Sequence, residues 1–546
     1  MKGLMQDWPL TVMSIIDHAN RFHAEREVVT RTVEGPIHRC NYGDIHLRAR
    51  KCAQALQKLG MKQGDVIATM AWNTHRHMEA WYGIMGMGAV CHTLNPRLFA
   101  EQLTYIINHA EDQFILFDTT FVPVIEAVAD TIPNVKGFII LTDRANMPKT
   151  TLKNVHCYED IVEAEDGDFK WATVDENDAC GLCYTSGTTG NPKGVLYSHR
   201  SNVLHALAAN GADSLGMRSV DTVLPVVPMF HANAWAITFA APASGAKIVM
   251  PGANMDGESI YELLDTEQVT VTAAVPTVWL MLLQHLEATK VKLPALSRVI
   301  IGGSAAPRSM IETFERDYDV TVMHAWGMTE LSPMGTLGSF KAGMETLPFD
   351  KQLDIKVKQG RPIYTVEMKI TDDDGNDLPN DGVAFGHLMV RGPAISGAYL
   401  KGEGGEILDA DGWFDTGDVA TLDPLGFMQI TDRAKDVIKS GGEWISSIEL
   451  ENTAVGHPDV VEAAVIGIVH PKWDERPLLI VIQKEGANLS KEDVLGYMDG
   501  KIAKWWMPDD VVFVDEIPHT ATGKIQKLLL RQQFKDYQLP TANAAE

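Results

Sequence analysis

The sequence predicts an α/β protein with a large N-terminal domain and a small C-terminal one. Over the first 340 residues, short apolar or β-branched runs alternate with amphipathic stretches, as in parallel sheets covered by helices. From about 355 to 430, short strands and frequent turns indicate a β-rich subdomain. After Asp432 and Arg433, roughly 110 residues of mixed strands and helices are enough for a separate α+β domain.

Strands of the N-terminal part are predicted at 65–70, 114–117, 138–141, 247–250, 269–275 and 299–301. Helices are predicted at 259–268 and 277–287, where leucines and an isoleucine recur at helical spacing. Ligands of parallel sheets gather at the carboxyl ends of strands. A glycine-rich segment follows the apolar run 179–184, and Gly302 and Gly303 follow 299–301. We therefore expect a binding site at these two strand ends.

The β-rich subdomain is predicted from turn signals at 372–376 and 380–382. In the C-terminal part, strands are predicted at 460–469, 478–483 and 511–514, and helices at 491–504 and 525–534.

The chain is strongly acidic, with 72 acidic against 47 basic residues and a formal net charge of −25. Such a surface repels nucleic acid and anionic lipid, so neither is an expected partner. Any anionic ligand must be met by local groups of lysine, arginine and backbone N–H.

Cysteine content and hydropathy indicate a cytoplasmic protein. Six cysteines in 546 residues do not form a disulfide framework, and Cys180 and Cys183 are expected as buried strand residues rather than zinc ligands. The N-terminus has no apolar signal core, and no uninterrupted apolar stretch of 18 residues occurs. We expect no membrane span.

The segment 184–195 combines three glycines, four Ser/Thr residues and Lys193. Glycines let backbone N–H groups approach an anion, hydroxyls add donors, and lysine adds positive charge. A flexible surface turn would explain the glycines but not the interleaved hydroxyls. The segment lacks the Gly-Lys-Ser/Thr ending of the Walker loop. It indicates a polyphosphate ligand bound in another way.

This segment resembles the phosphate-binding loop of adenylate-forming enzymes, which include acyl-CoA synthetases, peptide-synthetase adenylation domains and luciferases. Segments at 228–235, 302–307, 324–330, 413–418, 432–443 and 518–524 match the same family in order. The resemblance covers nearly the whole chain and is closest to short- and medium-chain acyl-CoA synthetases. It implies an N-terminal AMP-binding domain at 1–431, a hinge at 432–435 and a mobile C-terminal domain at 436–546. It also implies ATP, Mg²⁺ and CoA as cofactor and cosubstrates.

The resemblance assigns the nucleotide site residue by residue. The phosphates would be held by Thr185, Ser186, Gly187, Thr188, Thr189, Gly190 and Lys193. Adenine and the α-phosphate would meet Ser304, Ala305, Ala306, His324, Ala325, Trp326, Gly327, Met328 and Thr329, and the ribose side would meet Asp418, Ile430 and Arg433.

The implied catalytic residues are Lys524, His231, Thr329 and Glu330. Lys524 would bridge acyl and phosphate oxygens, and Thr329 would donate to the α-phosphate. Glu330 and Thr185 would hold Mg²⁺, a hard cation that prefers oxygen ligands. His231 would gate the acyl pocket, since a carboxylate nucleophile is already ionised at neutral pH.

The hinge segment implies a second half-reaction with CoA. In the family the C-terminal domain rotates and presents another face to the acyl-adenylate. The residues carried over to this step are Lys435, Lys439, Gly441, Gly442, Glu443 and Trp444.

The acid is expected to meet Trp235, Gly302, Gly327, Met328, Pro333 and Met334. A tryptophan shortens the pocket, and its ring can contact a sulfur atom favourably. No basic residue stands among these positions to bind a second carboxylate on the acid. The resemblance implies a short- or medium-chain acid such as 3-methylmercaptopropionate. His387 and His519 depart from the usual family pattern, the first as a structural change and the second as a less basic catalytic loop.

Four alternatives remain. The chain could load a carrier protein instead of CoA, although no carrier-like segment is present. It could accept fatty acids without preferring a thioether, act as a luciferase-type oxygenase, or serve as a nucleotide sensor with Lys524 and Glu330 idle. A homodimer is expected by family analogy alone.

Overall fold

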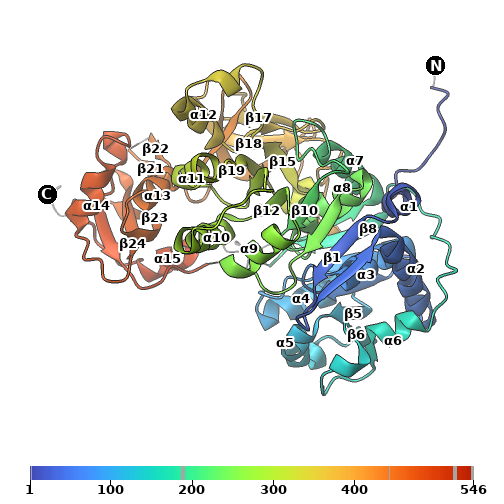
Figure 1. Ribbon diagram of the computed structural model, residues 1–546. Helices are drawn as coiled ribbons and strands as arrows, with labels where there is room; N and C mark the ends of the chain where they lie inside the picture. The colour runs from blue at the N-terminus through green and yellow to red at the C-terminus, as the bar shows by residue number, and fades with distance from the viewer. Residues whose placement is uncertain (2, 186–190, 442, 520–524, 543–546) are drawn as a thin grey trace.

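The computed structural model describes residues 1, 3–185, 191–441, 443–519 and 525–542 (Figure 1). Strands in this part of the chain form four sheets, two of which are large and mainly parallel. The predicted α/β class is confirmed. In Figure 1 the C-terminal segment forms a separate lobe beside the larger body that carries the N-terminus.

The first large sheet has a continuous apolar interior. Its strand β5 is fully buried along its length, as expected of a parallel strand covered on both faces. Neighbouring strands are parallel except for the last pair. Their order is β7 (Val155–Cys157), β6 (Gly137–Ile140), β5 (Phe114–Phe117), β3 (Val66–Met70), β4 (Val90–Thr93), β8 (Ala179–Tyr184) and β9 (Gly194–Ser198).

The second large sheet is parallel from β14 to β1 and antiparallel at both ends. Its order is β16 (Arg361–Pro362), β15 (Met334–Leu337), β14 (Thr321–Gly327), β13 (Arg298–Ile301), β12 (Val271–Ala274), β10 (Thr222–Pro225), β11 (Lys247–Met250), β1 (Glu27–Arg31) and β2 (Ile37–Asn41).

Helices cover the two large sheets, and local caps explain several of their starts. The Asn41 side chain accepts from the Asp44 N–H, and the Asp44 carboxylate accepts from the Asn41 N–H, so that this pair caps the start of α2. The helices are α1 (Val12–His23), α2 (Tyr42–Lys58), α3 (His75–Gly86), α4 (Ala100–Ala110), α5 (Val122–Val128), α6 (Tyr158–Glu163), α7 (His199–Ala209), α8 (Ile237–Ser244), α9 (Gly257–Thr266), α10 (Pro276–Thr289), α11 (Arg308–Tyr318) and α12 (Phe349–Lys356).

Two smaller sheets follow. The antiparallel sheet of the predicted β-rich subdomain contains β17 (Glu367–Thr371), β18 (Phe385–Arg391), β19 (Phe414–Leu422) and β20 (Met428–Arg433). The C-terminal sheet contains β22 (Glu443–Ile445), β21 (Ile438–Ser440), β24 (Asp474–Gln483), β23 (Val460–His470) and β25 (Asp510–Phe513). Helices α13 (Ser447–Val455), α14 (Lys491–Met498) and α15 (Lys527–Gln533) belong to the C-terminal region.

One predicted element is too long. The helix predicted at 491–504 ends as α14 at Met498. Asp499 has an extended backbone and Gly500 has a φ of 74°, a left-handed conformation that suits glycine and stops the helix. The other predicted helices and strands lie within a few residues of the observed ones.

Strand ends bring the sequence motifs together. Strand β8 ends at Tyr184, immediately before the glycine-rich segment, and β13 ends at Ile301, immediately before Gly302. Cys180 and Cys183 are buried on β8, as predicted. Within the described ranges, no helix is long and apolar enough to cross a membrane.

Candidate active site

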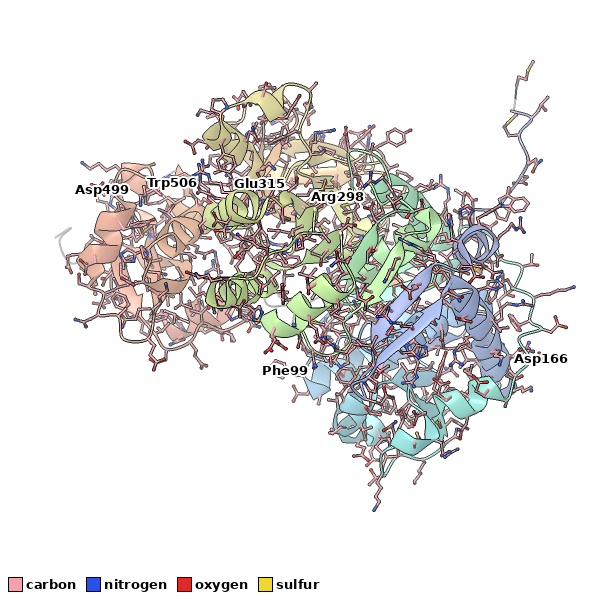
Figure 2. The ribbon with its side chains drawn as sticks, viewed as in Figure 1. Phe99, Asp166, Arg298, Glu315, Asp499 and Trp506 are labelled. Atoms are coloured by element: carbon pink, nitrogen blue, oxygen red, sulfur yellow. The ribbon has the colours of Figure 1, made fainter. Side chains whose placement is uncertain are left out.

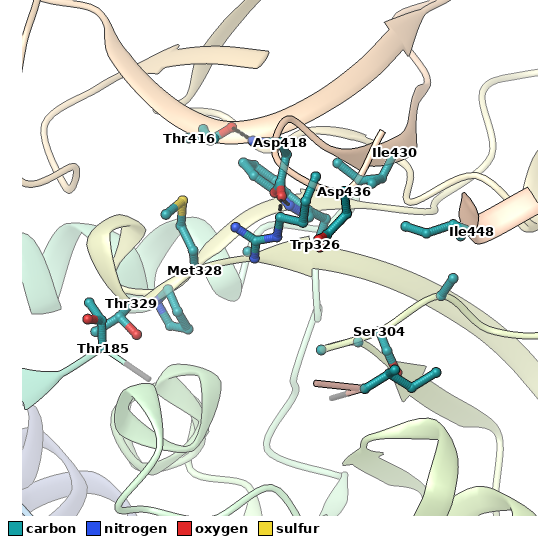
Figure 3. A pocket seen from close by; sticks show the side chains of 18 of the residues that line it. Thr185, Ser304, Trp326, Met328, Thr329, Thr416, Asp418, Ile430, Asp436 and Ile448 are labelled. Carbon is teal, nitrogen blue, oxygen red and sulfur yellow. Dashed lines mark hydrogen bonds and ion pairs between the residues drawn. The ribbon is translucent and has the colours of Figure 1, made fainter. Parts of the chain in front are cut away.

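A cavity of about 1290 Å³ lies at the carboxyl ends of β8, β13 and β14 (Figure 3). Segments from the β17–β20 sheet and from the C-terminal region complete its walls. The predicted site residues that line it are Thr185, Lys193, His231, Trp235, Gly302, Ser304, Ala305, Ala325, Trp326, Gly327, Met328, Thr329, Glu330, Pro333, Met334, Asp418, Ile430, Arg433 and Lys435. Residues that lie far apart in the sequence thus share one space.

Asp418 is the anchor of the corner expected to hold the nucleoside. Its side chain is only 5% exposed, and its carboxylate accepts a hydrogen bond of 2.8 Å from Trp326 Nε1 and pairs with Arg433 Nε at 2.7 Å (Figure 3). Both oxygens therefore have a donor that fixes their orientation. A carboxylate held in this way can accept hydrogen bonds from vicinal hydroxyls, as a ribose presents them.

His324 does not line the cavity, although the resemblance places it in the nucleotide site. Burial lowers the pKa of His324 to about 4, so the ring is neutral. Its Nδ1–H donates to the Val357 carbonyl at 3.1 Å, and its Nε2 accepts from the Ala306 N–H at 3.3 Å. His324 thus supports the turn at 304–306 from behind, and Ala306 also stays outside the cavity lining.

The expected phosphate corner is built around Thr185 and Lys193. The Thr185 N–H donates to the Lys193 carbonyl at 2.9 Å, and the Lys193 N–H donates to Thr185 Oγ1 at 3.1 Å. These bonds close the base of the glycine-rich segment. Ser186, Gly187, Thr188, Thr189 and Gly190 lie outside the described residues.

Thr329 and Glu330 face the same corner and are held by two tyrosines. The Tyr197 hydroxyl donates to the Thr329 carbonyl at 2.7 Å. The Tyr399 hydroxyl donates to Glu330 Oε1 at 2.6 Å, and Glu330 is 5% exposed. The Glu330 carboxylate is therefore fixed in place at the cavity wall.

The oxygen donors at this corner fit Mg²⁺ bound together with phosphates. Mg²⁺ is usually held by one or two carboxylates, with substrate phosphates and water completing its shell. Glu330 supplies a carboxylate and Thr185 a hydroxyl, both at the cavity. No group of three or more His, Cys, Asp or Glu suited to a metal occurs in the described part of the chain. The protein thus offers a partial shell rather than a complete cage.

Trp235 stands at the apolar end of the cavity, with Leu215, Ile300, Ala325 and Met334. It lies in a short turn, Ala232–Ala236, whose residues all have positive φ. A Cβ atom at position 302 would lie 3.0 Å from Trp235 Cη2, so glycine leaves room for the indole. This end can receive a short apolar chain.

The segment predicted as a hinge contacts both the N-terminal part and the C-terminal region. Arg433 pairs with Asp418 of the N-terminal part. Asp432, in contrast, accepts from the Ser447 N–H at 2.7 Å, and Asp436 pairs with Arg531 Nη1 at 2.7 Å. Contacts with the N-terminal part and contacts with the C-terminal region therefore alternate along this segment.

A buried lysine strengthens the attachment on the C-terminal side. Lys527 Nζ lies 2.8 Å from Glu451 Oε1 and also donates to Ser447 Oγ. Ser447 Oγ in turn donates to Asp432 at 2.5 Å. Nearby Glu451 and Asp432 raise the pKa of Lys527 above its ordinary value despite burial. Sequence reasoning did not single out Lys527.

Three of the residues expected to serve CoA do not line the cavity, whereas Lys435 does. Lys439, Gly441 and Trp444 are not among its lining residues. The Trp444 ring instead packs against Phe385 and His387 of β18, with ring centroids 5.6 and 6.3 Å apart. Lys439 Nζ lies 5.1 Å from the centroid of the Trp444 ring. Gly442 lies outside the described residues, and Glu443 begins β22.

Lys524 lies outside the described residues, but both flanks of its segment are described. His519 and Ile525 form an antiparallel bridge. His519 Nε2 lies 2.7 Å from Glu462 Oε1, and this contact raises the pKa of His519. Both His519 and Glu462 line the cavity.

Several lining residues were missed by sequence reasoning, among them Tyr399, Arg97 and Phe99. Phe99 is 76% exposed and stands at the edge of the larger body (Figure 2). Tyr399 and Glu330 are 69 positions apart. No local spacing marks such contacts, so only the folded chain reveals them.

Comparisons with known proteins agree with this geometry. The "AMP-binding enzyme" family profile matches residues 16–400, and the profile of its C-terminal domain matches residues 449–524. The chain is 52% identical to 3-methylmercaptopropionyl-CoA ligase of Ruegeria lacuscaerulensis, over 98% of this chain and 99% of that protein. It is 48% identical to medium-chain-fatty-acid–CoA ligase of Ectopseudomonas oleovorans, over the full length of both.

A solved anthranilate CoA ligase in complex with anthranoyl-AMP has a similar fold, with a TM-score of 0.86 and 24% identity. The alignment covers 97% of this chain and 99% of that one. The fold, the gathering of the motifs around one cavity, and two family profiles that together span most of the chain lead to one conclusion: the chain belongs to the AMP-binding enzyme family.

Proposed function

We propose that this chain is an ATP-dependent acid–CoA ligase for a short- or medium-chain acid such as 3-methylmercaptopropionate. The carboxylate of the acid attacks the α-phosphate of ATP, which forms an acyl-adenylate and releases pyrophosphate. The thiol of CoA then attacks the acyl carbon, so that a thioester forms, AMP leaves and the thiol proton passes to solvent.

One observation carries the proposal: residues assigned to the nucleoside, to the phosphates and to the acyl chain all line a single cavity. Asp418 would receive the ribose hydroxyls, and Lys193 would meet the terminal phosphates. Trp235 would bound the acyl chain. This arrangement supports placing a carboxylate beside the α-phosphate, where orientation lowers the barrier.

Charge stabilisation is the main task of the residues around the reacting atoms. Two anions must approach each other, so donors and cations that meet the developing charge lower the barrier. Thr329 would donate to the α-phosphate, and Lys524, by family resemblance, would bridge acyl and phosphate oxygens. Mg²⁺, held by Glu330 and Thr185, would neutralise phosphate charge.

The acid is proposed from the shape and chemistry of the apolar end. Trp235, Ile300 and Met334 offer no charge to a second carboxylate. A tryptophan face can meet a thioether sulfur favourably. The names of the two curated relatives support the same range, from a thioether acid to a medium-chain fatty acid. His231 would adjust this end of the cavity between the two half-reactions.

The CoA step is proposed to use a second arrangement of the C-terminal domain about 432–435. Lys439, Gly441 and Trp444 lie away from the cavity here, which supports a change of face before CoA can reach the acyl-adenylate. Lys435, Gly442 and Glu443 are assigned to that step by resemblance.

Two further properties belong to the proposal. We place the enzyme in the cytoplasm, which agrees with six free cysteines, five of them buried. We also propose a homodimer, which sedimentation equilibrium would test directly.

The experiment is acid-dependent ATP–pyrophosphate exchange, followed by thioester formation with free CoA. We expect both with 3-methylmercaptopropionate and with fatty acids of four to eight carbons, and neither with dicarboxylic acids. Exchange without thioester would overturn the ligase proposal in favour of carrier loading. Absence of exchange with every acid would favour a nucleotide sensor.

A further inference from the structure

A segment of the β-rich subdomain crosses the phosphate corner. We call residues 394–405 the strap. Its main chain is bound to the Glu330 region: the Ser396 N–H donates to the Glu330 carbonyl at 2.8 Å, and Ser332 Oγ donates to the Ala394 carbonyl at 2.7 Å. The strap therefore begins in fixed contact with the segment expected to bind the metal.

Tyr399, in the middle of the strap, contacts two groups of the phosphate corner. Its hydroxyl donates to Glu330 Oε1 at 2.6 Å. Lys193 Nζ lies 4.9 Å from the centroid of its ring, within cation–π range.

The far part of the strap is anchored on α4. Glu403 Oε1 accepts from the Tyr105 hydroxyl at 2.5 Å and lies 3.7 Å from His109 Nε2. Lys401 Nζ lies 2.6 Å from Glu111 Oε1, just beyond the end of the helix. Contacts on both sides of Tyr399 therefore limit its freedom to move.

The strap also passes close to Lys193 and its neighbour. A Cβ atom at Gly404 would lie 2.9 Å from Lys193 Nζ, and one at Gly194 would lie 3.0 Å from Leu400 Cβ. The strap thus packs directly on the base of the glycine-rich segment, and Tyr399 is held on a rigid support.

We propose that Tyr399 is a positioning residue of the phosphate site, whose hydroxyl orients Glu330 toward the divalent cation and whose ring supports Lys193. This inference rests on the proposed function only in taking Mg²⁺-ATP as the ligand. A hydrogen bond to one carboxylate oxygen restricts rotation of the Glu330 carboxylate. The side chain therefore loses less conformational entropy when it binds the cation. Partners of this kind commonly change metal affinity about 10- to 100-fold when removed.

Two substitutions separate the hydroxyl from the ring. Tyr399→Phe removes the hydrogen bond to Glu330 but keeps the ring beside Lys193. Tyr399→Leu removes both contacts. Tyr364→Phe is the matched control, because Tyr364 belongs to the same subdomain and its side chain is 92% exposed.

The measurement is the dissociation constant of ATP by titration calorimetry, with Mg²⁺ and with EDTA, in the absence of acid. We expect Tyr399→Phe to weaken Mg²⁺-ATP binding about tenfold and to leave metal-free ATP binding unchanged. Tyr399→Leu should weaken both forms, and Tyr364→Phe neither. Circular dichroism and thermal melting of each variant check that the fold is retained.

Two outcomes would overturn the inference. One is equal weakening of both ATP forms by Tyr399→Phe, and the other is no change in either. Failure of the proposed function would look different, because the wild-type protein would then bind Mg²⁺-ATP but form no acyl-CoA from any acid.

Discussion

The indole nitrogen of Trp326 donates a hydrogen bond of 2.8 Å to the carboxylate of Asp418, a residue 92 positions later in the chain. This bond joins the end of β14 to β19, and therefore joins a large parallel sheet to the β-rich sheet. Arg433, at the end of β20, pairs with the same carboxylate at 2.7 Å. A substitution at Asp418 should therefore change the affinity for the nucleotide.

Asp418→Asn should weaken ATP binding about 10- to 100-fold, because a charged acceptor of hydrogen bonds is lost. The Asn side chain can still accept from Trp326, so the fold should be retained. ATP titration by calorimetry checks the affinity. Asp381→Asn, on an exposed turn of the same subdomain, is the control. Unchanged affinity in Asp418→Asn would remove Asp418 from the nucleotide site.

Trp235→Ala should raise kcat/KM for eight-carbon acids relative to four-carbon acids by about tenfold or more, since the apolar end is lengthened. Gly302→Ala should reduce activity with every acid, because the new Cβ would lie 3.0 Å from Trp235 Cη2. In the double variant the conflict with the indole is gone, while the contact of 3.2 Å between the new Cβ and the Ala325 carbonyl oxygen remains, so the two effects should add only in part. A chain-length profile that is the same in Trp235→Ala as in the wild type would place the acid elsewhere.

Lys524→Ala should lower acid-dependent ATP–pyrophosphate exchange by about 10²-fold or more, because a charge that meets the transition state is removed. Thioester formation from supplied acyl-adenylate and CoA should be largely retained. Lys535→Ala, at an exposed lysine 11 positions later in the chain, is the control. Equal loss of both half-reactions would contradict the proposal that the C-terminal domain presents a different face to the cavity in each half-reaction.

The ion pair of His519 and Glu462 should stabilise the protein only at lower pH. Because the pair raises the pKa of His519 in the folded state, its contribution is complete below the unfolded pKa of about 6.5. It is lost as pH rises through the higher folded pKa. The melting temperature of the wild type should therefore exceed that of His519→Gln at pH 6 and equal it at pH 9.

Glu462→Gln should show the same pattern, since it removes the other partner of the pair. The two groups are partly exposed, so we expect an effect of at most about 1 kcal/mol. A stability difference that is the same at both pH values would contradict the role of the ion pair.

Lys527→Met should destabilise the protein by about 3–5 kcal/mol, because Glu451 and Asp432 would keep buried charge without their cation. The double variant Lys527→Met, Glu451→Gln should recover part of this loss. Denaturant unfolding measures the free energies. A loss below about 1 kcal/mol in the single variant would show that solvent compensates these carboxylates.

Much of the fold could be predicted because its signals are local. Apolar runs such as 114–117 and 299–301 are short enough to be recognised singly, and both are strands. The glycine-rich segment follows β8, as the position of its apolar run indicates. The helix predicted at 491–504 was too long because Asp499 and Gly500 leave the helical conformation within an otherwise favourable stretch.

The sequence by itself determined the α/β class, the order of the motifs and the identity of many of the cavity residues, since each motif is a run of neighbouring residues. Only the tertiary structure decided that His324 supports the cavity wall from behind, that Trp444 packs on Phe385 and His387, and that Tyr399 reaches Glu330. These contacts join residues 18 to 69 positions apart. Local propensity acts over a few residues, whereas contacts of this kind form only when whole sheets and their connecting segments pack together.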